Sequence, residues 1–142
     1  MDHLTAKATI VVNAPVAVVW DALTNPAIIT QYMFGAEVVS DWQEGSRIIW
    51  KGIWNEKPYE DHGVILKITK ERLLQYTHFS PLAGQPDLPE NYHTVTTTLT
   101  SDGTKTTITI LQDGNQSEEA RTHSEKNWAM MLSGLKKVIE KQ

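Results

Sequence analysis

The sequence predicts an α+β fold in which a curved antiparallel sheet wraps around one long C-terminal helix. Apolar residues alternate over residues 3–12 and again over 34–113, as in strands with one buried face. They repeat at helical spacing over residues 13–33 and after residue 117. Only the last of these segments is long enough to cover a sheet of six or seven strands, and such a sheet must bury one face.

The composition indicates one ordinary soluble domain over residues 1–142. The net charge of −4 argues against a nucleic-acid partner, which requires a basic surface. The absence of cysteine excludes disulfides and thiol chemistry. We find neither a signal-peptide pattern nor an apolar run of about 20 residues, so we expect a cytoplasmic protein without membrane insertion.

Turn and capping residues divide the first third of the chain. We expect a strand over residues 3–12, and then a helix that Asn13 caps, with Pro15 in its first turn. Asn25 precedes Pro26, which ends this helix because a residue before proline leaves the helical region. A second short helix is predicted over residues 26–33.

Six further strands and a long helix follow. The strands are predicted at 34–42, 45–54, 58–69, 71–80, 91–101 and 104–113. Asp102 and Gly103 favour a two-residue hairpin. The connection over residues 80–91 holds three prolines and one glycine, is too long for a tight hairpin, and is a candidate binding loop. Ser117 is the predicted cap of the last helix.

Five motifs, taken in order, resemble a known family. They are "NAPVAVVWDALTNP", "GSRIIW", "RLLQYTHFSP", "ENYHTVTTTLTSDGTKTTITILQDGN" and "SEKNWAMMLSGLKKVIE". Together they resemble the helix-grip (START-like, birch-pollen-allergen-like) fold of the SRPBCC superfamily. Within it they are similar to the family named for the activator of the heat-shock-protein-90 ATPase. The resemblance covers nearly the whole chain.

This resemblance implies a hydrophobic cavity between the sheet and the long helix. The superfamily includes lipid carriers, hormone and polyketide binders, cyclases and co-chaperone domains. The sequence does not match the additional N-terminal domain of the eukaryotic co-chaperone, which weighs against a chaperone-activating role.

Strand alternation and the inner stripe of the last helix together predict the wall of this cavity. The candidate ligand-binding residues are Ile48, Trp50, Trp54, Leu66, Tyr76, His78, Val95, Ile108, Arg121, Ser124, Trp128 and Met131. The strand members share one face only if no bulge intervenes, because one extra residue reverses the alternation. The alternative is that the aromatic residues form an ordinary filled core.

The last helix is apolar in its C-terminal half and polar in its N-terminal half. A cavity with one wet end would produce this pattern, and Arg121 would then pair with a ligand carboxylate or phenolate. The alternative is that the first two turns simply extend past the sheet into solvent.

The function that these patterns favour is the binding of a small hydrophobic, aromatic or lipid-like molecule. One alternative is a cavity enzyme that uses His78 and Tyr76 for acid–base chemistry. Another is a chaperone-accessory or stress-response interaction protein, as the family name suggests. Glu119 and His123 have the spacing of a metal-binding pair, but without a third ligand we expect a solvated pair. No cofactor, metal or catalytic residue is assigned, and a monomer or weak dimer is expected.

Overall fold

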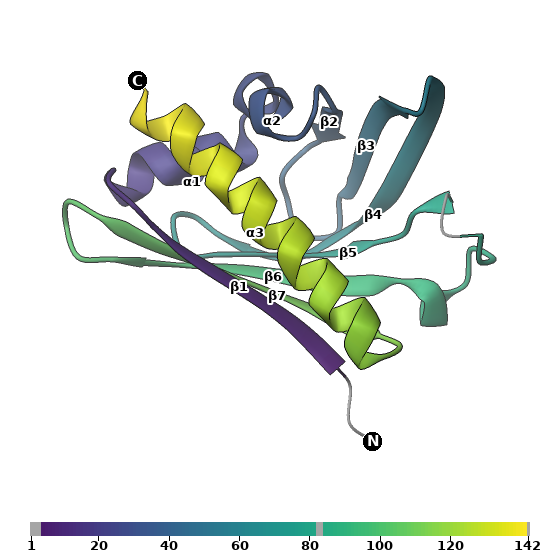
Figure 1. Ribbon diagram of the computed structural model, residues 1–142. Helices are drawn as coiled ribbons and strands as arrows, with labels where there is room; N and C mark the ends of the chain where they lie inside the picture. Colours follow the sequence, from purple (N-terminus) through teal and green to yellow (C-terminus); the bar gives the residue numbers. More distant parts are fainter. Residues whose placement is uncertain (1–3, 82–83, 142) are drawn as a thin grey trace.

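The computed structural model describes residues 4–81 and 84–141, apart from the side chain of Trp54. It confirms the predicted helix-grip architecture: α3 lies across a strongly curved antiparallel sheet, and α1 and α2 cover one end (Figure 1). The strand order is β1-β7-β6-β5-β4-β3-β2. The elements are β1 (Leu4–Val12), α1 (Val16–Thr24), α2 (Pro26–Tyr32), β2 (Glu37–Ser40), β3 (Arg47–Trp54), β4 (Lys57–Thr69), β5 (Leu73–His78), the 3-10 turn η2 (Pro89–Asn91), β6 (His93–Ser101), β7 (Thr106–Asn115) and α3 (Glu118–Glu140).

The helix starts follow capping chemistry, with one correction. Ser117 caps α3 as predicted, since its side chain accepts a hydrogen bond from the Ala120 amide. Asn13 does not cap α1, whose N-cap is Pro15. The Asn13 amide instead donates to Glu140 of α3, so this residue holds the chain against the last helix. Asn25 caps α2 through the Ala27 amide.

Two turns are longer than predicted. The β6–β7 connection has four residues, because Ser101 pairs with Thr106 and the Asp102 side chain accepts a hydrogen bond from the Lys105 amide. The two-residue hairpin prediction is therefore wrong. The first predicted strand of the meander shortens to Glu37–Ser40, because Phe34 and Gly35 both have positive φ, 56° and 81°, and turn the chain.

Strand β4 contains a bulge, and the inward faces predicted from strand alternation required that no bulge be present. Its pairing with β5 shifts register between Ile65 and Lys67. Ile65 is therefore fully buried, whereas Leu66 is 41% exposed on the outer face. The inward orientation predicted for Leu66 is wrong for this reason. Nearby, a Cβ on Gly63 would lie 1.7 Å from the Thr77 carbonyl oxygen, so only glycine fits where β4 meets β5.

Side chains of α3 also cover the free edge of β1. Glu125 accepts from the Lys7 amide and Glu140 from the Asn13 amide, while the Lys136 ammonium donates to the Val11 carbonyl. These contacts use backbone groups that an edge strand would otherwise present to another chain. They also set the helix at a fixed angle across the sheet.

Three predictions concern parts of the chain that the structure does not describe. They are the strand start at His3, residues 82–83 of the proline-rich connection, and the inward side chain of Trp54. In the described part of the chain, no helix is long and apolar enough to cross a membrane.

Candidate functional site

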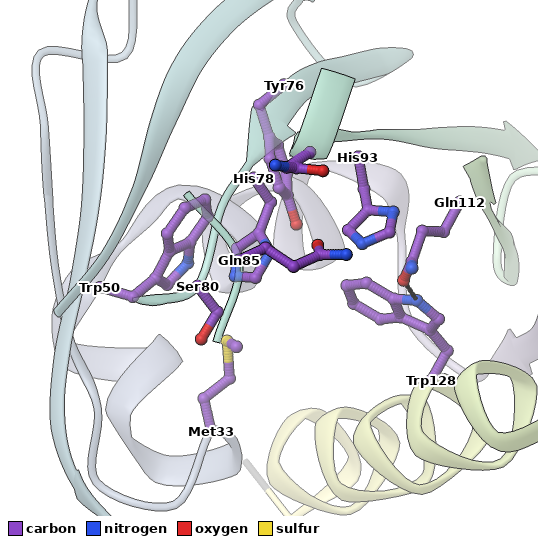
Figure 2. A pocket seen from close by; sticks show the side chains of 10 residues that line it. Met33, Trp50, Tyr76, His78, Ser80, Gln85, His93, Gln112 and Trp128 are labelled. Carbon is purple, nitrogen blue, oxygen red and sulfur yellow. Dashed lines mark hydrogen bonds between the residues drawn. The ribbon is translucent and has the colours of Figure 1, made fainter. Parts of the chain in front are cut away.

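A cavity of about 260 Å³ lies between the sheet, the N-terminal half of α3 and the connection that precedes β6 (Figure 2). Its wall is aromatic on the sheet and helix sides and carries amides and imidazoles toward the connection. The lining residues are Met33, Trp50, Tyr76, His78, Ser80, Gln85, Asn91, His93, Gln112 and Trp128. A second hollow of about 40 Å³ lies deeper, against α2, and shares Met33, Trp50, Tyr76 and Trp128 with the first.

The sheet side of the wall is built around the indole of Trp50 from β3. The ring of Tyr76 lies 5.2 Å from it and the ring of His78 lies 5.0 Å from it, measured between centroids. Tyr76 and His78 alternate with Thr77 on β5, so both project from the same face of the sheet. Both side chains point toward the cavity in Figure 2.

Tyr76 places a phenol hydroxyl on the sheet side of the cavity wall, beside Trp50. Its hydroxyl makes no hydrogen bond to any residue that the structure describes. Burial raises the pKa of Tyr76 well above its usual range. The phenol therefore stays protonated at physiological pH and presents a hydrogen-bond donor to the cavity.

Behind the wall, His78 is held by a carboxylate. Its Nε2 atom lies 2.9 Å from Oδ2 of Asp61 on β4. Because an ionised carboxylate only accepts hydrogen bonds, Nε2 donates to it, and Nδ1 is the acceptor in the neutral form of the ring. The other carboxylate oxygen of Asp61, Oδ1, is buried and has no partner among the described residues. Asp61 itself does not line the cavity.

The opposite wall is also oriented by hydrogen bonds. His93 Nδ1 lies 3.0 Å from the carbonyl oxygen of Asp113, so Nδ1 donates and Nε2 is the acceptor. The indole N–H of Trp128 donates to Gln112 Oε1 at 2.6 Å, drawn as the dashed line in Figure 2. The amide NH₂ group of Gln112 then remains as a donor on the cavity wall.

The connection before β6 is fastened to the sheet beside the cavity. His62 Nε2 on β4 lies 3.2 Å from Asp87 Oδ2, and the Tyr92 hydroxyl donates to the same carboxylate. The ring of Tyr92 also stacks on Phe79, with centroids 5.1 Å apart. Bonding to Asp87 raises the pKa of Tyr92. These contacts hold in place the segment that supplies Gln85 and Asn91 to the wall.

An exposed apolar groove adjoins the cavity on its helix side. It has a volume of about 530 Å³ and shares Met33, Gln112 and Trp128 with the cavity. Phe34 and Met130 form its outer rim, and Phe34 is 83% exposed. An aromatic ring at positive φ with so much of its surface in water is uncommon.

The structure brings seven of the predicted residues to these hollows. Trp50, Tyr76, His78 and Trp128 line the cavity, Ile48 and Met131 line the deeper hollow, and Ser124 lines the groove. Val95 and Ile108 are buried in the filled core without lining the cavity. Leu66 lies on the outer face, as described above.

Arg121 does not lie on the cavity wall. Its guanidinium donates to Glu118 at 2.8 Å and lies 3.5 Å from Glu125, on the flank of α3 that faces β1. Hydrogen bonding to Glu118 raises the pKa of Arg121. The polar half of α3 thus serves mainly to attach the helix to the sheet: Ser124 donates to Asn115, and Asn115 donates to the Leu4 carbonyl.

Several wall residues are absent from the predicted set. Gln112 continues the inward alternation of Ile108 and Ile110. A polar residue at the end of an otherwise apolar strand face could therefore have been predicted to line the cavity. His93 is one of three histidines, with His62 and His78, in the strands near the proline-rich connection, and its spacing alone does not distinguish it as a wall residue. Met33 on the wall and Asp61 behind it depend on the α2 turn and on the bulge in β4, which alternation does not show.

No group of three His, Asp or Glu side chains that could hold a metal occurs in the described residues.

The family model described as Activator of Hsp90 ATPase homolog 1-like protein matches residues 13–140. The chain belongs to this family. No curated protein matches the sequence significantly.

Solved structures of similar proteins agree with this assignment. A protein from Cytophaga hutchinsonii with a known solution structure is 54% identical to this chain. The match covers 99% of this chain and 97% of that protein, with a TM-score of 0.88. Protein MLL2253 from Mesorhizobium loti shares 20% identity over 97% of this chain and 98% of its own, with a TM-score of 0.79. DynU16, a protein in the dynemicin biosynthetic locus, shares 17% identity over 96% of this chain and 47% of its own, with a TM-score of 0.80. The last two establish the fold alone.

Proposed function

We propose that this member of the Activator of Hsp90 ATPase homolog 1-like family binds a small, mainly aromatic molecule in the cavity between its sheet and α3. The observation that carries the proposal is the hollow between Trp50, Tyr76 and Trp128, whose rings offer flat apolar surface around an open volume. A core that served stability alone would be filled, because protein interiors pack as densely as organic crystals.

The size of the cavity narrows the ligand class. Ligand pockets commonly measure about 300–1,000 Å³, and this cavity, at about 260 Å³, lies just below that range. A molecule with one or two rings suits this volume. A long acyl chain would have to extend beyond the cavity, past Met33 and Trp128, which also line the neighbouring groove.

The polar groups on the wall define the functional groups of the ligand. Tyr76 and the Gln112 amide offer donors, while His93 Nε2 offers an acceptor. An aromatic molecule that carries a carbonyl or hydroxyl group would satisfy them. Arg121 is paired elsewhere, so a carboxylate is not required for recognition.

Fluorescence titration with fatty acids, flavonoids and small aromatic acids and ketones tests this proposal. We expect saturable quenching by the one- and two-ring aromatic compounds, and loss of affinity in Trp128→Ala and Tyr76→Phe. Leu66→Ala is the matched control, since it truncates an apolar side chain on the outer face. The absence of quenching by every compound would contradict ligand binding at this site.

The groove supports a second candidate, a chaperone-accessory role. Such a role needs exposed apolar surface rather than an internal cavity, and Phe34 with Met130 provides it. The ATPase rate of a purified Hsp90-type chaperone, measured with and without this protein, is the direct test. An unchanged rate would contradict this candidate and would leave the ligand-binding proposal unaffected.

A further inference from the structure

The wall of the cavity holds a hydrogen-bond donor, Tyr76, and a histidine, His78, whose pairing with a buried carboxylate ligand binding alone does not explain. Tyr76 is a neutral donor without a partner among the described residues, and His78 is an imidazole backed by the carboxylate of Asp61. Recognition of a carbonyl group uses the Tyr76 donor, but it does not require an imidazole that is backed by a carboxylate. The buried, unpartnered Oδ1 atom of Asp61 adds an electrostatic cost that a purely structural pair would avoid.

We propose that the cavity catalyses proton transfer at a carbon next to the carbonyl group of a small aromatic ketone, with His78 as the base and Tyr76 as the donor to the carbonyl oxygen. The proposal rests on the proposed function, because the ketone must first occupy the cavity. It requires only side chains that line the cavity and one residue, Asp61, behind it.

The step balances without a cofactor. The C–H bond breaks and its proton forms an N–H bond at Nδ1 of His78. The released electron pair becomes the C=C bond of an enolate, and the carbonyl π pair moves to the oxygen, where the Tyr76 hydroxyl donates a hydrogen bond. Return of the proton, to the same carbon or to one conjugated with it, restores His78 and yields an exchanged or isomerised ketone.

The geometry of β5 suits this division of roles. Tyr76 and His78 lie two residues apart on one strand face, so their Cα atoms are about 7 Å apart. Both rings contact Trp50, with centroids 5.2 and 5.0 Å away, which gives a planar ketone a flat surface beside both groups. A donor at the carbonyl oxygen and an acceptor at the neighbouring carbon can then act on one molecule.

Asp61 is the positioning residue. Its contact with Nε2 selects the tautomer in which Nδ1 is free to accept a proton. Its negative charge also stabilises the imidazolium that forms in the step, as an orienting carboxylate does for other histidine bases.

Deuterium exchange tests the proposal directly. 2-Tetralone is a two-ring aromatic ketone whose C1 hydrogens are next to the carbonyl, and their exchange in D₂O is followed by proton NMR. We expect the protein to accelerate exchange roughly 10²-fold or more over buffer at the same pD, the usual size of general acid–base catalysis. His78→Asn and Tyr76→Phe should abolish the acceleration, whereas His123→Asn, which alters an exposed histidine on α3, should retain it.

Binding and exchange are measured on the same samples, so that a failure of catalysis can be distinguished from a failure of ligand binding. Quenching by 2-tetralone with exchange at the buffer rate would overturn catalysis and leave ligand binding intact. No binding of 2-tetralone would overturn the inference, and no binding of any aromatic compound would overturn the proposed function as well. Loss of exchange in His93→Asn with an active His78→Asn would overturn the assignment of the base.

The role of Asp61 has its own readout. In the wild-type protein the imidazole ¹⁵N shifts of His78 should report a proton on Nε2. Asp61→Asn should lower the exchange rate and populate the other tautomer while the far-ultraviolet circular dichroism remains unchanged. Unaltered ¹⁵N shifts in Asp61→Asn would overturn the positioning role.

Discussion

The two ends of the space between α3 and the sheet are built differently. At the C-terminal end of the helix, Leu132, Leu135 and Ile139 are almost completely buried and pack in one hydrophobic core with residues of α1 and the strands. At the N-terminal end, Trp128 is only partly buried and borders an open volume with polar walls. One helix therefore closes a dry core at one end and a lined cavity at the other.

This difference places the burial that stabilises the fold at one end and the proposed ligand site at the other. The filled end supplies the apolar burial that holds helix and sheet together. The hollow end forgoes part of that burial and keeps polar groups in an aromatic wall, and the unpartnered carboxylate oxygen of Asp61 lies behind that wall. Departures from good packing of this kind are expected at functional sites.

The largest effect is predicted at the filled end. Leu135→Ala should lower the free energy of unfolding by about 2–5 kcal/mol, because Leu135 is fully buried and its loss leaves a cavity. Met130→Ala, on the exposed side of the same helix, is the matched control and should change stability little. Urea denaturation measures both. Equal midpoints for the two variants would contradict the contrast between the ends.

A smaller loss is predicted where β4 meets β5. Gly63→Ala should destabilise the fold by roughly 1–3 kcal/mol, since its Cβ would overlap the Thr77 carbonyl oxygen. Gly134→Ala should act in the opposite direction by about 0.5–1 kcal/mol, because it adds helix propensity to α3 and meets Tyr32 at an ordinary 3.6 Å. A stable Gly63→Ala protein would show that β4 can shift without cost.

Alkaline pH should lower the free energy of unfolding through two buried tyrosines, Tyr32 and Tyr76. Burial raises the pKa of Tyr32, which donates to the Ala22 carbonyl, and of Tyr76. Above pH 10 or so the unfolded chain releases these protons while the folded chain keeps them, so stability falls as pH rises, by about 1.4 kcal/mol per pH unit for each tyrosine. Urea midpoints at about pH 9 and pH 11 measure the slope. An unchanged slope in the double variant Tyr32→Phe/Tyr76→Phe would contradict this origin.

The smallest effect on stability is predicted at the groove. Phe34→Gly should change the free energy of unfolding by no more than about 0.5 kcal/mol, since the ring is exposed and glycine accepts the positive φ. Its affinity for aromatic compounds in the cavity should match that of the wild type. A large loss of cavity binding in this variant would show that the groove and the cavity act as one site.

The order of elements could be predicted from the sequence because alternation and helical spacing are local properties of the chain. The Trp50, Tyr76, His78 and Trp128 positions followed from the same rule, and they do meet at the cavity. The rule failed at Leu66, where the bulge in β4 reverses the faces, and at Arg121, where the acidic neighbours on the helix hold the guanidinium. Neither a bulge nor a choice between ion-pair partners has a periodic signature.

The sequence by itself therefore determined the class of fold, the sheet of seven strands and the aromatic character of the inner wall. Only the tertiary structure decided that one end is filled and the other hollow, that Asp61 lies against His78, and that Gln112 and His93 face the same space. The physical reason is that spacing along a chain sets which face a side chain occupies. The twist, bulges and helix angle that bring those faces together depend on contacts between residues far apart in the sequence.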